Sequence, residues 1–319
     1  MPSGCVFTES SKVCALPSQL ALRGITTSSG CRLRRWFAIG LLLVVVLLSG
    51  CAMRWQENWQ DVSPDRPTNA SNSLAEQARQ IYKDAGDEQR LRASIAAYEQ
   101  VLAVNPGDSQ ALTALSTQHI LLGTAYTSGR REKSRQFLTA MDYAERAMYS
   151  NQAFKAQVAT GTPPWDAVEL LEADQLEAMF FWVKALHYQF KEGLTLAGKI
   201  ANIRWMERGL KMLDRIVEID PAFGGGGVEF AMAISYEVLP RRWGGSSERA
   251  DAYMQRAVEE HQDWLLPRWA RGRYYYEIRG EPEKSQADLA WVASRNPQDY
   301  TDPYAWKRFF QADAGGFLP

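Results

Sequence analysis

Cysteine is scarce in this chain, and all of it lies near the start. The four cysteines are Cys5, Cys14, Cys31 and Cys51, so none follows position 51. With no second cysteine, the segment from Cys51 onward can form neither an internal disulfide nor a thiolate metal site. Its stability must come from the burial of apolar surface, and a segment of about 270 residues is long enough for a sizeable core.

Long apolar runs are equally scarce. Trp36 to Leu48 is the most apolar stretch, and its 13 residues fall short of the roughly 20 that a helix needs to cross a bilayer. A basic cluster at 32–35 precedes this stretch, and Leu48-Ser49-Gly50-Cys51 ends it. A positive start, an apolar centre and small residues before a cleavage point are typical of a bacterial export signal. We therefore favour a lipoprotein signal, in which Cys51 is acylated, over the alternative of a transmembrane anchor.

This interpretation places the mature protein outside the cytoplasm. Residues 1–50 are predicted to be a signal peptide with an N-terminal extension, because the first 31 residues do not resemble an export signal. The lipid on Cys51 is the predicted anchor, since nothing after it is long and apolar enough to span a bilayer. Ala52 stands where an Asp tends to hold lipoproteins in the inner membrane, so we expect a periplasmic protein attached to the outer membrane.

Basic residues are not in excess. With the first 50 residues removed, the chain keeps 31 of its 36 Lys and Arg and 36 of its 37 Asp and Glu, a net charge of −5. No basic stripe stands out along the sequence. Nucleic acid is therefore not an expected partner.

What the sequence does contain, from Ser73 onward, is helical periodicity almost throughout. Residues 51–72 are polar, contain two prolines and show no such period, so we expect a lipidated flexible tether there and a helical domain over 73–319. Within the domain one spacing recurs: a small residue, a larger or apolar residue four positions on, an apolar residue three further on, and a turn five after that. It occurs as Ser94, Tyr98, Val101, Pro106; Ala140, Ala144, Ala147, Gln152; Gly209, Leu213, Ile216, Pro221; Ala250, Met254, Ala257, Gln262; and Ser285, Leu289, Val292, Pro297.

This spacing is typical of the second helix of a tetratricopeptide repeat (TPR), in which the small residue lets the partner helix approach. A first helix is expected before each copy, near 74–85, 108–124, 170–191, 226–238 and 265–279. The predicted fold is therefore all-α: an irregular TPR-like helical repeat, an α-solenoid of about five helix pairs. The turns lie 46, 69, 41 and 35 residues apart, against about 34 in a regular array. We expect an inserted loop near 150–170 to account for the longest interval.

Three segments resemble one known family. They are Ala178-Met179-Phe180-Phe181-Trp182, Pro221-Ala222-Phe223-Gly224-Gly225-Gly226-Gly227 and Leu239-Pro240-Arg241-Arg242-Trp243-Gly244-Gly245-Ser246. With the lipoprotein signal and the TPR-like helices, they resemble the TatT component, a lipoprotein associated with tripartite ATP-independent periplasmic (TRAP) transporters. The resemblance covers roughly 75–300, and its glycine motifs are the most specific part because generic TPR proteins lack them. The segment before the signal is a departure from the family.

The resemblance implies a membrane-tethered helical protein that partners a periplasmic solute-binding protein. It also implies self-association as a trimer, and a cleft or pore in each protomer that would admit a hydrophobic or carboxylate-bearing solute. Tethered through its lipid alone, such a protein would act as an accessory component of solute uptake.

Two groups of residues are candidates for ligand binding. Successive residues turn by 100° on a helix, so the neighbouring aromatics at 180–182 cannot all face the repeat core, and we choose Trp182 and Tyr188 to line a cleft. Arg241 and Arg242, beside Trp243 in a glycine-rich loop, are interpreted as a fork for a carboxylate on a solute or partner. The alternatives are core aromatics in the first case and two solvated charges before a helix in the second.

Enzymatic chemistry is not expected. The three histidines, His119, His187 and His261, are far apart and lie in no HExxH motif, and no Ser or Cys nucleophile motif is present. Gly224 to Gly227 lack the Lys-Ser/Thr sequel of a nucleotide-binding P-loop, so a tightly packed turn is favoured over an anion cradle. We predict no catalytic residue, no metal and no cofactor.

Two functions remain open on the sequence. The first is an accessory of a TRAP-type uptake system that binds a solute-binding protein and shelters an apolar organic acid. The second is a TPR scaffold lipoprotein that organises envelope or outer-membrane assembly complexes through protein contacts alone. A hydrolase of cell-wall material is a weaker third interpretation, because the sequence shows no catalytic pair.

Replacing the predicted lipid-bearing residue tests the anchor. Cys51→Ser removes the thiol that would be acylated, so the variant should be released from membranes or accumulate as an unprocessed precursor. Membrane fractionation with intact-mass measurement checks this, and Cys31→Ser, which lies before the apolar run, serves as the control. Unchanged processing and attachment of the Cys51→Ser protein would contradict the lipoprotein assignment.

Overall fold

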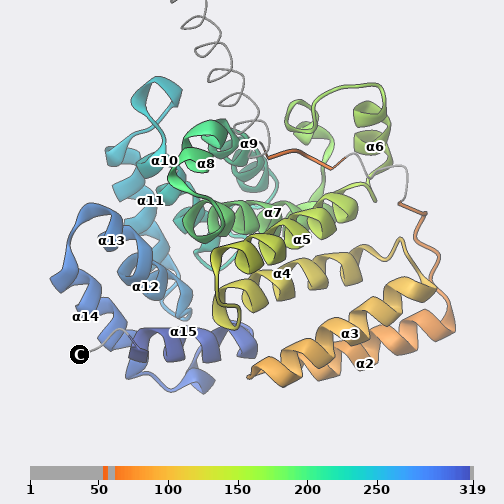
Figure 1. The fold of residues 1–319 in the computed structure, drawn as a ribbon, viewed down its shortest axis with the longest axis horizontal. Coiled ribbons are helices and arrows are strands. Elements are labelled where there is room, and N and C mark those ends of the chain that lie inside the picture. The colour runs from red at the N-terminus through yellow and green to blue at the C-terminus, as the bar shows by residue number, and fades with distance from the viewer. Residues whose placement is uncertain (1–52, 57–61, 317–319) are drawn as a thin grey trace, which may run out of the picture. The chain divides into compact units, whose positions relative to one another are not determined.

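The computed structural model describes residues 53–56 and 62–316, which lie in a compact unit spanning Cys51–Pro319 (Figure 1). Every regular element among these residues is helical. The predicted signal segment and Cys51 lie outside the described residues. None of the helices in the described ranges has the length and apolar character needed to cross a membrane.

The helices of the described ranges form five consecutive pairs followed by a last helix, so the predicted all-α, irregular TPR-like repeat is confirmed. The pairs are α2 (Asn69–Lys83) with α3 (Glu88–Val104); α4 (Ser109–Ala125) with α5 (Arg130–Met148); α7 (Leu176–Tyr188) with α9 (Arg204–Ile219); α10 (Gly227–Val238) with α11 (Ser247–Glu260); and α12 (Leu266–Ala270), the π-helical turn η7 (Arg271–Tyr275) and α13 (Tyr276–Arg279) with α14 (Pro282–Ala293). The last helix is α15 (Tyr304–Gly316).

Short polar side chains begin several of these helices. Asp87 accepts a hydrogen bond from the Arg90 amide at 2.8 Å at the start of α3, and Asp108 accepts one from the Ala111 amide at 2.9 Å at the start of α4. Such caps satisfy amide groups that have no partner within the helix. The chain therefore changes direction where the sequence places a turn residue and an acceptor together.

The small residues of the repeat lie at the closest approaches between paired helices. Ser94, Ala140 and Ala250 have 0% exposure. A Cβ on Gly209 would lie 3.2 Å from Leu186 Cδ2 in the partner helix α7, and one on Gly272 would lie 3.0 Å from Asp288 Cβ in α14. The repeat register predicted from the sequence is therefore the register of the structure.

The irregular spacing comes from inserted elements. The predicted loop near 150–170 contains a helix, α6 (Gln152–Ala159), followed by the 3-10 turns η2 (Pro164–Asp166), η3 (Val168–Leu170) and η4 (Ala173–Gln175). Between α7 and α9 the chain forms a π-helical turn, η5 (Gln189–Gly193), and a short helix, α8 (Leu196–Asn202). The sequence pattern did not predict α8, because it extended the preceding helix to 191.

Residues 53–56 of the predicted flexible tether are packed on the domain, whereas residues 63–70 are exposed. The Trp55 side chain is 9% exposed and donates its indole hydrogen to Tyr149 Oη at 2.6 Å. The Met53 amide donates to Asn202 Oδ1 at 2.7 Å, and the Gln56 amide to Glu145 Oε2 at 2.8 Å. The helical domain also begins earlier than expected, at Asn69 rather than 73.

The last helix returns to the first ones. α15 packs against α14 and α12, and also against α2 and α4 from the start of the repeat (Figure 1). Trp306 on α15 donates its indole hydrogen to Thr117 Oγ1 on α4 at 3.2 Å. The array is therefore closed by a contact between its two ends, which an open solenoid lacks.

The repeat register can be tested at its tightest position. Ala250→Phe should lower the free energy of unfolding by about 1–3 kcal/mol, because the larger ring cannot fit between α10 and α11 without moving them. Ala252→Phe on the same helix is the matched control, since Ala252 is exposed. Equal denaturant midpoints for the two variants would show that the assigned register is wrong.

Candidate functional site

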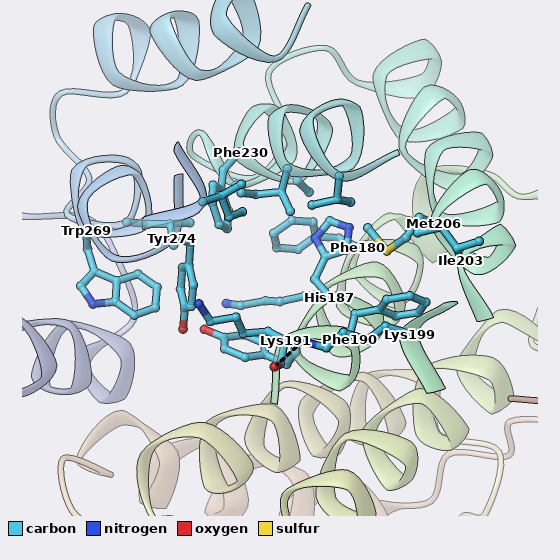
Figure 2. Close-up of a pocket in the computed structure, with 18 residues that line it drawn as sticks. Phe180, His187, Phe190, Lys191, Lys199, Ile203, Met206, Phe230, Trp269 and Tyr274 are labelled. Carbon is cyan, nitrogen blue, oxygen red and sulfur yellow. Dashed lines mark hydrogen bonds between the residues drawn. The ribbon is translucent and has the colours of Figure 1, made fainter. Parts of the chain in front are cut away.

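A cavity of about 360 Å³ lies among the third, fourth and fifth helix pairs (Figure 2). Its walls come from α7, η5, α8, α9, α10, α12, η7 and α13. This volume is in the range of pockets that hold small organic ligands. In Figure 2, Trp269 and Tyr274 stand on one side of the space, and Met206 and Ile203 on the other.

The lining is mostly apolar and rich in aromatic rings. The apolar and aromatic members are Phe180, Tyr188, Phe190, Ile203, Met206, Phe230, Ala231, Ile234, Val238, Leu266, Trp269, Tyr274 and Ile278. The polar members are few: Lys184, His187, Lys191 and Lys199. An apolar ligand would exchange water for hydrocarbon contacts along most of its surface.

Helix α7 supplies the floor of the cavity from one face. Phe180, Lys184, His187 and Tyr188 all line it, and their spacing of four, three and one residues keeps them on one side of a helix. Tyr188 was predicted to line a cleft, and the structure places it in this wall.

Trp182, the other predicted lining residue, faces away from the cavity, and that prediction is corrected. The Trp182 side chain is 0% exposed, its ring centre lies 5.3 Å from that of Trp55, and its indole hydrogen is donated to Glu145 Oε1 at 2.9 Å. As expected, the neighbouring aromatic side chains of this helix point in different directions. The ring that turns to the cavity is that of Phe180.

The glycine run before α10 brings that helix close to α7 and α12. Gly224, Gly225 and Gly226 have φ of 94°, 55° and 83°, values that favour glycine. A Cβ on Gly225 would lie 2.3 Å from the Trp264 ring, and one on Gly227 would lie 2.7 Å from Phe180 Cζ. The run is therefore a tightly packed turn, and its last glycine forms part of the cavity wall.

Lys184 is the buried cation of the cavity. Its ammonium nitrogen lies 3.4 Å from the centre of the Trp306 ring, a cation–π contact. Burial lowers the pKa of Lys184 to about 7, although the nearby Asp302 carboxylate acts in the opposite direction. No ion pair of Lys184 is found within the described part of the chain, and the Asp302 oxygens accept the amides of Leu265 and Leu266 at 2.7 and 3.2 Å.

The other titratable groups deep in the cavity are neutral at physiological pH. Burial lowers the pKa of His187 to about 4, and its Nε2 lies 3.1 Å from Ser235 Oγ. Burial raises the pKa of both Tyr188 and Tyr274. Among these groups Lys184 alone changes charge near neutral pH.

Two further lysines lie at the rim. Lys191 pairs with Glu277 at 2.7 Å, and its nitrogen is 5.0 Å from the centre of the Tyr274 ring. Lys199 on α8 donates to the Lys191 carbonyl at 3.3 Å, the dashed contact in Figure 2. Two lysines therefore lie at the edge of the cavity, one of them in an ion pair, while the interior is apolar around one amine.

The predicted arginine fork lies elsewhere. Arg241, Arg242 and Trp243 form the 3-10 turn η6 (Arg241–Trp243) between α10 and α11, and none of them lines the cavity. Both arginines are exposed, and the Arg242 guanidinium carbon lies 4.5 Å from the centre of the Trp243 ring. These residues do not share a site with Tyr188, so any ligand of theirs must approach from outside.

Sequence reasoning missed most of the cavity, including Phe180, Lys184, Phe230 and Trp269. One signal was available: Lys184 is the only polar residue in the stretch from Ala178 to Leu186. A lysine in such a run is costly to bury without a function. No group of three or more His, Cys, Asp or Glu positioned to hold a metal was found among the described residues.

Comparisons with known proteins gave one family match and a structural match. Residues 127–297, more than half of the chain, match the family described as TAtT, the TRAP transporter T-component. Among solved structures, the chain is similar to a thermophilic TPR protein from Thermus thermophilus, with 18% identity, a TM-score of 0.46, and coverage of 77% of this chain and 100% of that one. A search of curated proteins gave no match.

Proposed function

The chain belongs to the TRAP transporter T-component family, and on this premise we propose that its cavity shelters an apolar carboxylate solute for a partner solute-binding protein. Family membership implies an accessory role in TRAP transport and a periplasmic location, and the family is one of transport accessory proteins rather than enzymes. The lipid on Cys51 and self-association as a trimer belong to the same proposal.

One observation carries the choice of solute: a single buried ammonium, that of Lys184, in a cavity lined almost wholly by apolar groups. A charge-assisted hydrogen bond from an amine to a carboxylate is stronger than one between neutral groups. Hydrocarbon or aromatic parts of the solute would contact the rings of Phe180, Phe230 and Trp269. A solute with a carboxylate at one end and an apolar body therefore fits the cavity better than a sugar or an inorganic ion does.

Binding of octanoate and octanol, measured by calorimetry, tests this assignment. Octanoate should bind more tightly, and Lys184→Met should weaken its binding roughly ten- to a hundredfold through loss of the charge-assisted bond, while octanol binding is retained or improved. Lys191→Met, at the rim, is the matched control and should change octanoate affinity much less. Equal octanoate affinity in the wild type and Lys184→Met would overturn the assigned role of Lys184.

The same binding should depend on pH with a defined sign. Lys184 is protonated below its pKa of about 7, and a bound carboxylate would raise that pKa. Octanoate affinity should therefore be greatest between about pH 5, where the ligand is ionised, and about pH 7, and should fall as the pH rises further. Octanol should show no such fall, and neither ligand should show it in Lys184→Met.

Partner binding is proposed to use η6. The turn is exposed and is followed by Gly244 at φ 91°, so Arg241 and Arg242 are presented on a short, closed loop to a carboxylate of the partner. Crosslinking of the tagged protein in membranes, followed by mass spectrometry, should recover a periplasmic solute-binding protein. Recovery of envelope assembly factors alone would favour the scaffold function instead.

Paired substitutions localise that contact. Arg241→Ala with Arg242→Ala should reduce recovery of the solute-binding protein without lowering the melting temperature, because both side chains are exposed. Arg130→Ala with Arg131→Ala, another exposed adjacent pair, is the control and should leave recovery unchanged. A clear fall in melting temperature for the Arg241 and Arg242 pair would show that the loop is structural.

A further inference from the structure

Helix α8 exposes the most accessible large apolar side chains of the described chain. Leu196 is 75% exposed and Ile200 68%, whereas the other exposed large apolar residues lie between 37% and 48%. Leu196 and Ile200 are four residues apart and so share one face of the helix. Exposed apolar side chains that gather in one place on a monomer mark a surface that another apolar surface covers.

The position of α8 in the chain indicates what covers it. The last residue of α8, Asn202, is 3% exposed and accepts the Met53 amide hydrogen at 2.7 Å. Only Ala52 separates Met53 from Cys51, and two residues of chain reach at most about 7 Å. The chain that carries the predicted lipid is therefore fixed to the end of α8 at Met53, two residues after Cys51.

The charges around α8 suit the head-group region. Lys199 lies three residues after Leu196 and directly before Ile200, so it flanks the apolar face of the helix. Lys191 and the exposed Arg204 flank the helix in the chain. A short helix with apolar side chains and neighbouring basic groups lies in the membrane interface, with its apolar face buried by about 5–10 Å.

We propose that α8 lies in the membrane interface, with Leu196 and Ile200 inserted between lipids beside the acylated Cys51. This inference rests on the lipid anchor of the proposed function. It also orients the cavity, because Lys199 and Ile203, at the end of the same helix, line its wall. The side of the cavity that Lys199 and Ile203 line then faces the lipid surface, and an apolar carboxylate would pass between membrane and cavity over α8.

Fluorescence quenching in vesicles tests the contact on the full, acylated chain. The processed protein has no cysteine other than the acylated Cys51, so Leu196→Cys and Ile200→Cys each provide a single site for an environment-sensitive label. The labelled proteins are reconstituted in phosphatidylethanolamine–phosphatidylglycerol vesicles that contain lipids brominated on their acyl chains. Labels at both positions should be strongly quenched and blue-shifted.

Two control positions show whether quenching at 196 and 200 is specific to the apolar face of α8. Val104→Cys on α3 starts from a side chain that is 48% exposed, and its label should not be quenched. Ala201→Cys, exposed on a different face of α8, should be quenched less than Ile200→Cys. Labels at 196 and 200 that behave like the one at 104 would overturn the inference, and label self-quenching there without lipid quenching would identify a second copy as the covering surface.

The test separates this inference from the anchor on which it rests. Retention of the labelled protein on vesicles after a high-salt wash reports acylation independently of α8. A retained protein with unquenched labels at 196 and 200 would refute the membrane contact alone. Loss of the protein from vesicles would refute the lipid anchor, and octanoate binding in solution would remain as a separate measure of the cavity.

Discussion

A buried acidic side chain, that of Glu145 on α5, links the cavity helix α7 to the chain segment that precedes the helical domain. Its Oε1 accepts the Trp182 indole hydrogen at 2.9 Å, and its Oε2 accepts the Gln56 amide at 2.8 Å. Burial raises the pKa of Glu145 well above its usual range, and these two donors act against that rise. The first bond fixes the rotation of α7, so that Phe180, Lys184 and His187 face the cavity. The second fixes the chain five residues after the predicted lipid site, so one side chain holds both the cavity helix and the chain near the predicted anchor.

The closure of the helical array has an electrostatic consequence. α15 comes from the far end of the chain, yet it places Trp306 under the Lys184 ammonium and is held to α4 by the bond from Trp306 to Thr117. An aromatic face attracts a cation without neutralising it, whereas a carboxylate in the same place would form an ion pair with the amine. Asp302 is nearby and raises the pKa of Lys184, and its oxygens also accept two backbone amides. The fold thus keeps one amine buried and available to a ligand.

Sequence alone could predict the helix pairs but not the cavity. The repeat register follows from local spacing, because Ser94, Ala140 and Ala250 are small where a partner helix of the same pair must approach. Which of Phe180 and Trp182 faces the cavity depends on the hydrogen bond from Trp182 to Glu145, which lies 37 residues earlier in the chain. A pattern among neighbouring residues carries no information about so distant a contact. The docking of Trp55 was missed for a related reason: a polar, proline-containing segment is typical of a flexible tether, and a few long-range hydrogen bonds with one buried indole are enough to fix it.

The low pKa of Lys184 bears on release as well as on binding. If the cavity binds a carboxylate as proposed, a fully charged amine in it would be left without a partner when the carboxylate departs. Here the departing ligand leaves an amine that either loses its proton, with a pKa of about 7, or remains on the face of Trp306. Both states avoid an isolated buried charge, so the free-energy difference between the loaded and empty cavity is kept small. For the proposed carboxylate solute, this arrangement would favour reversible exchange over tight storage.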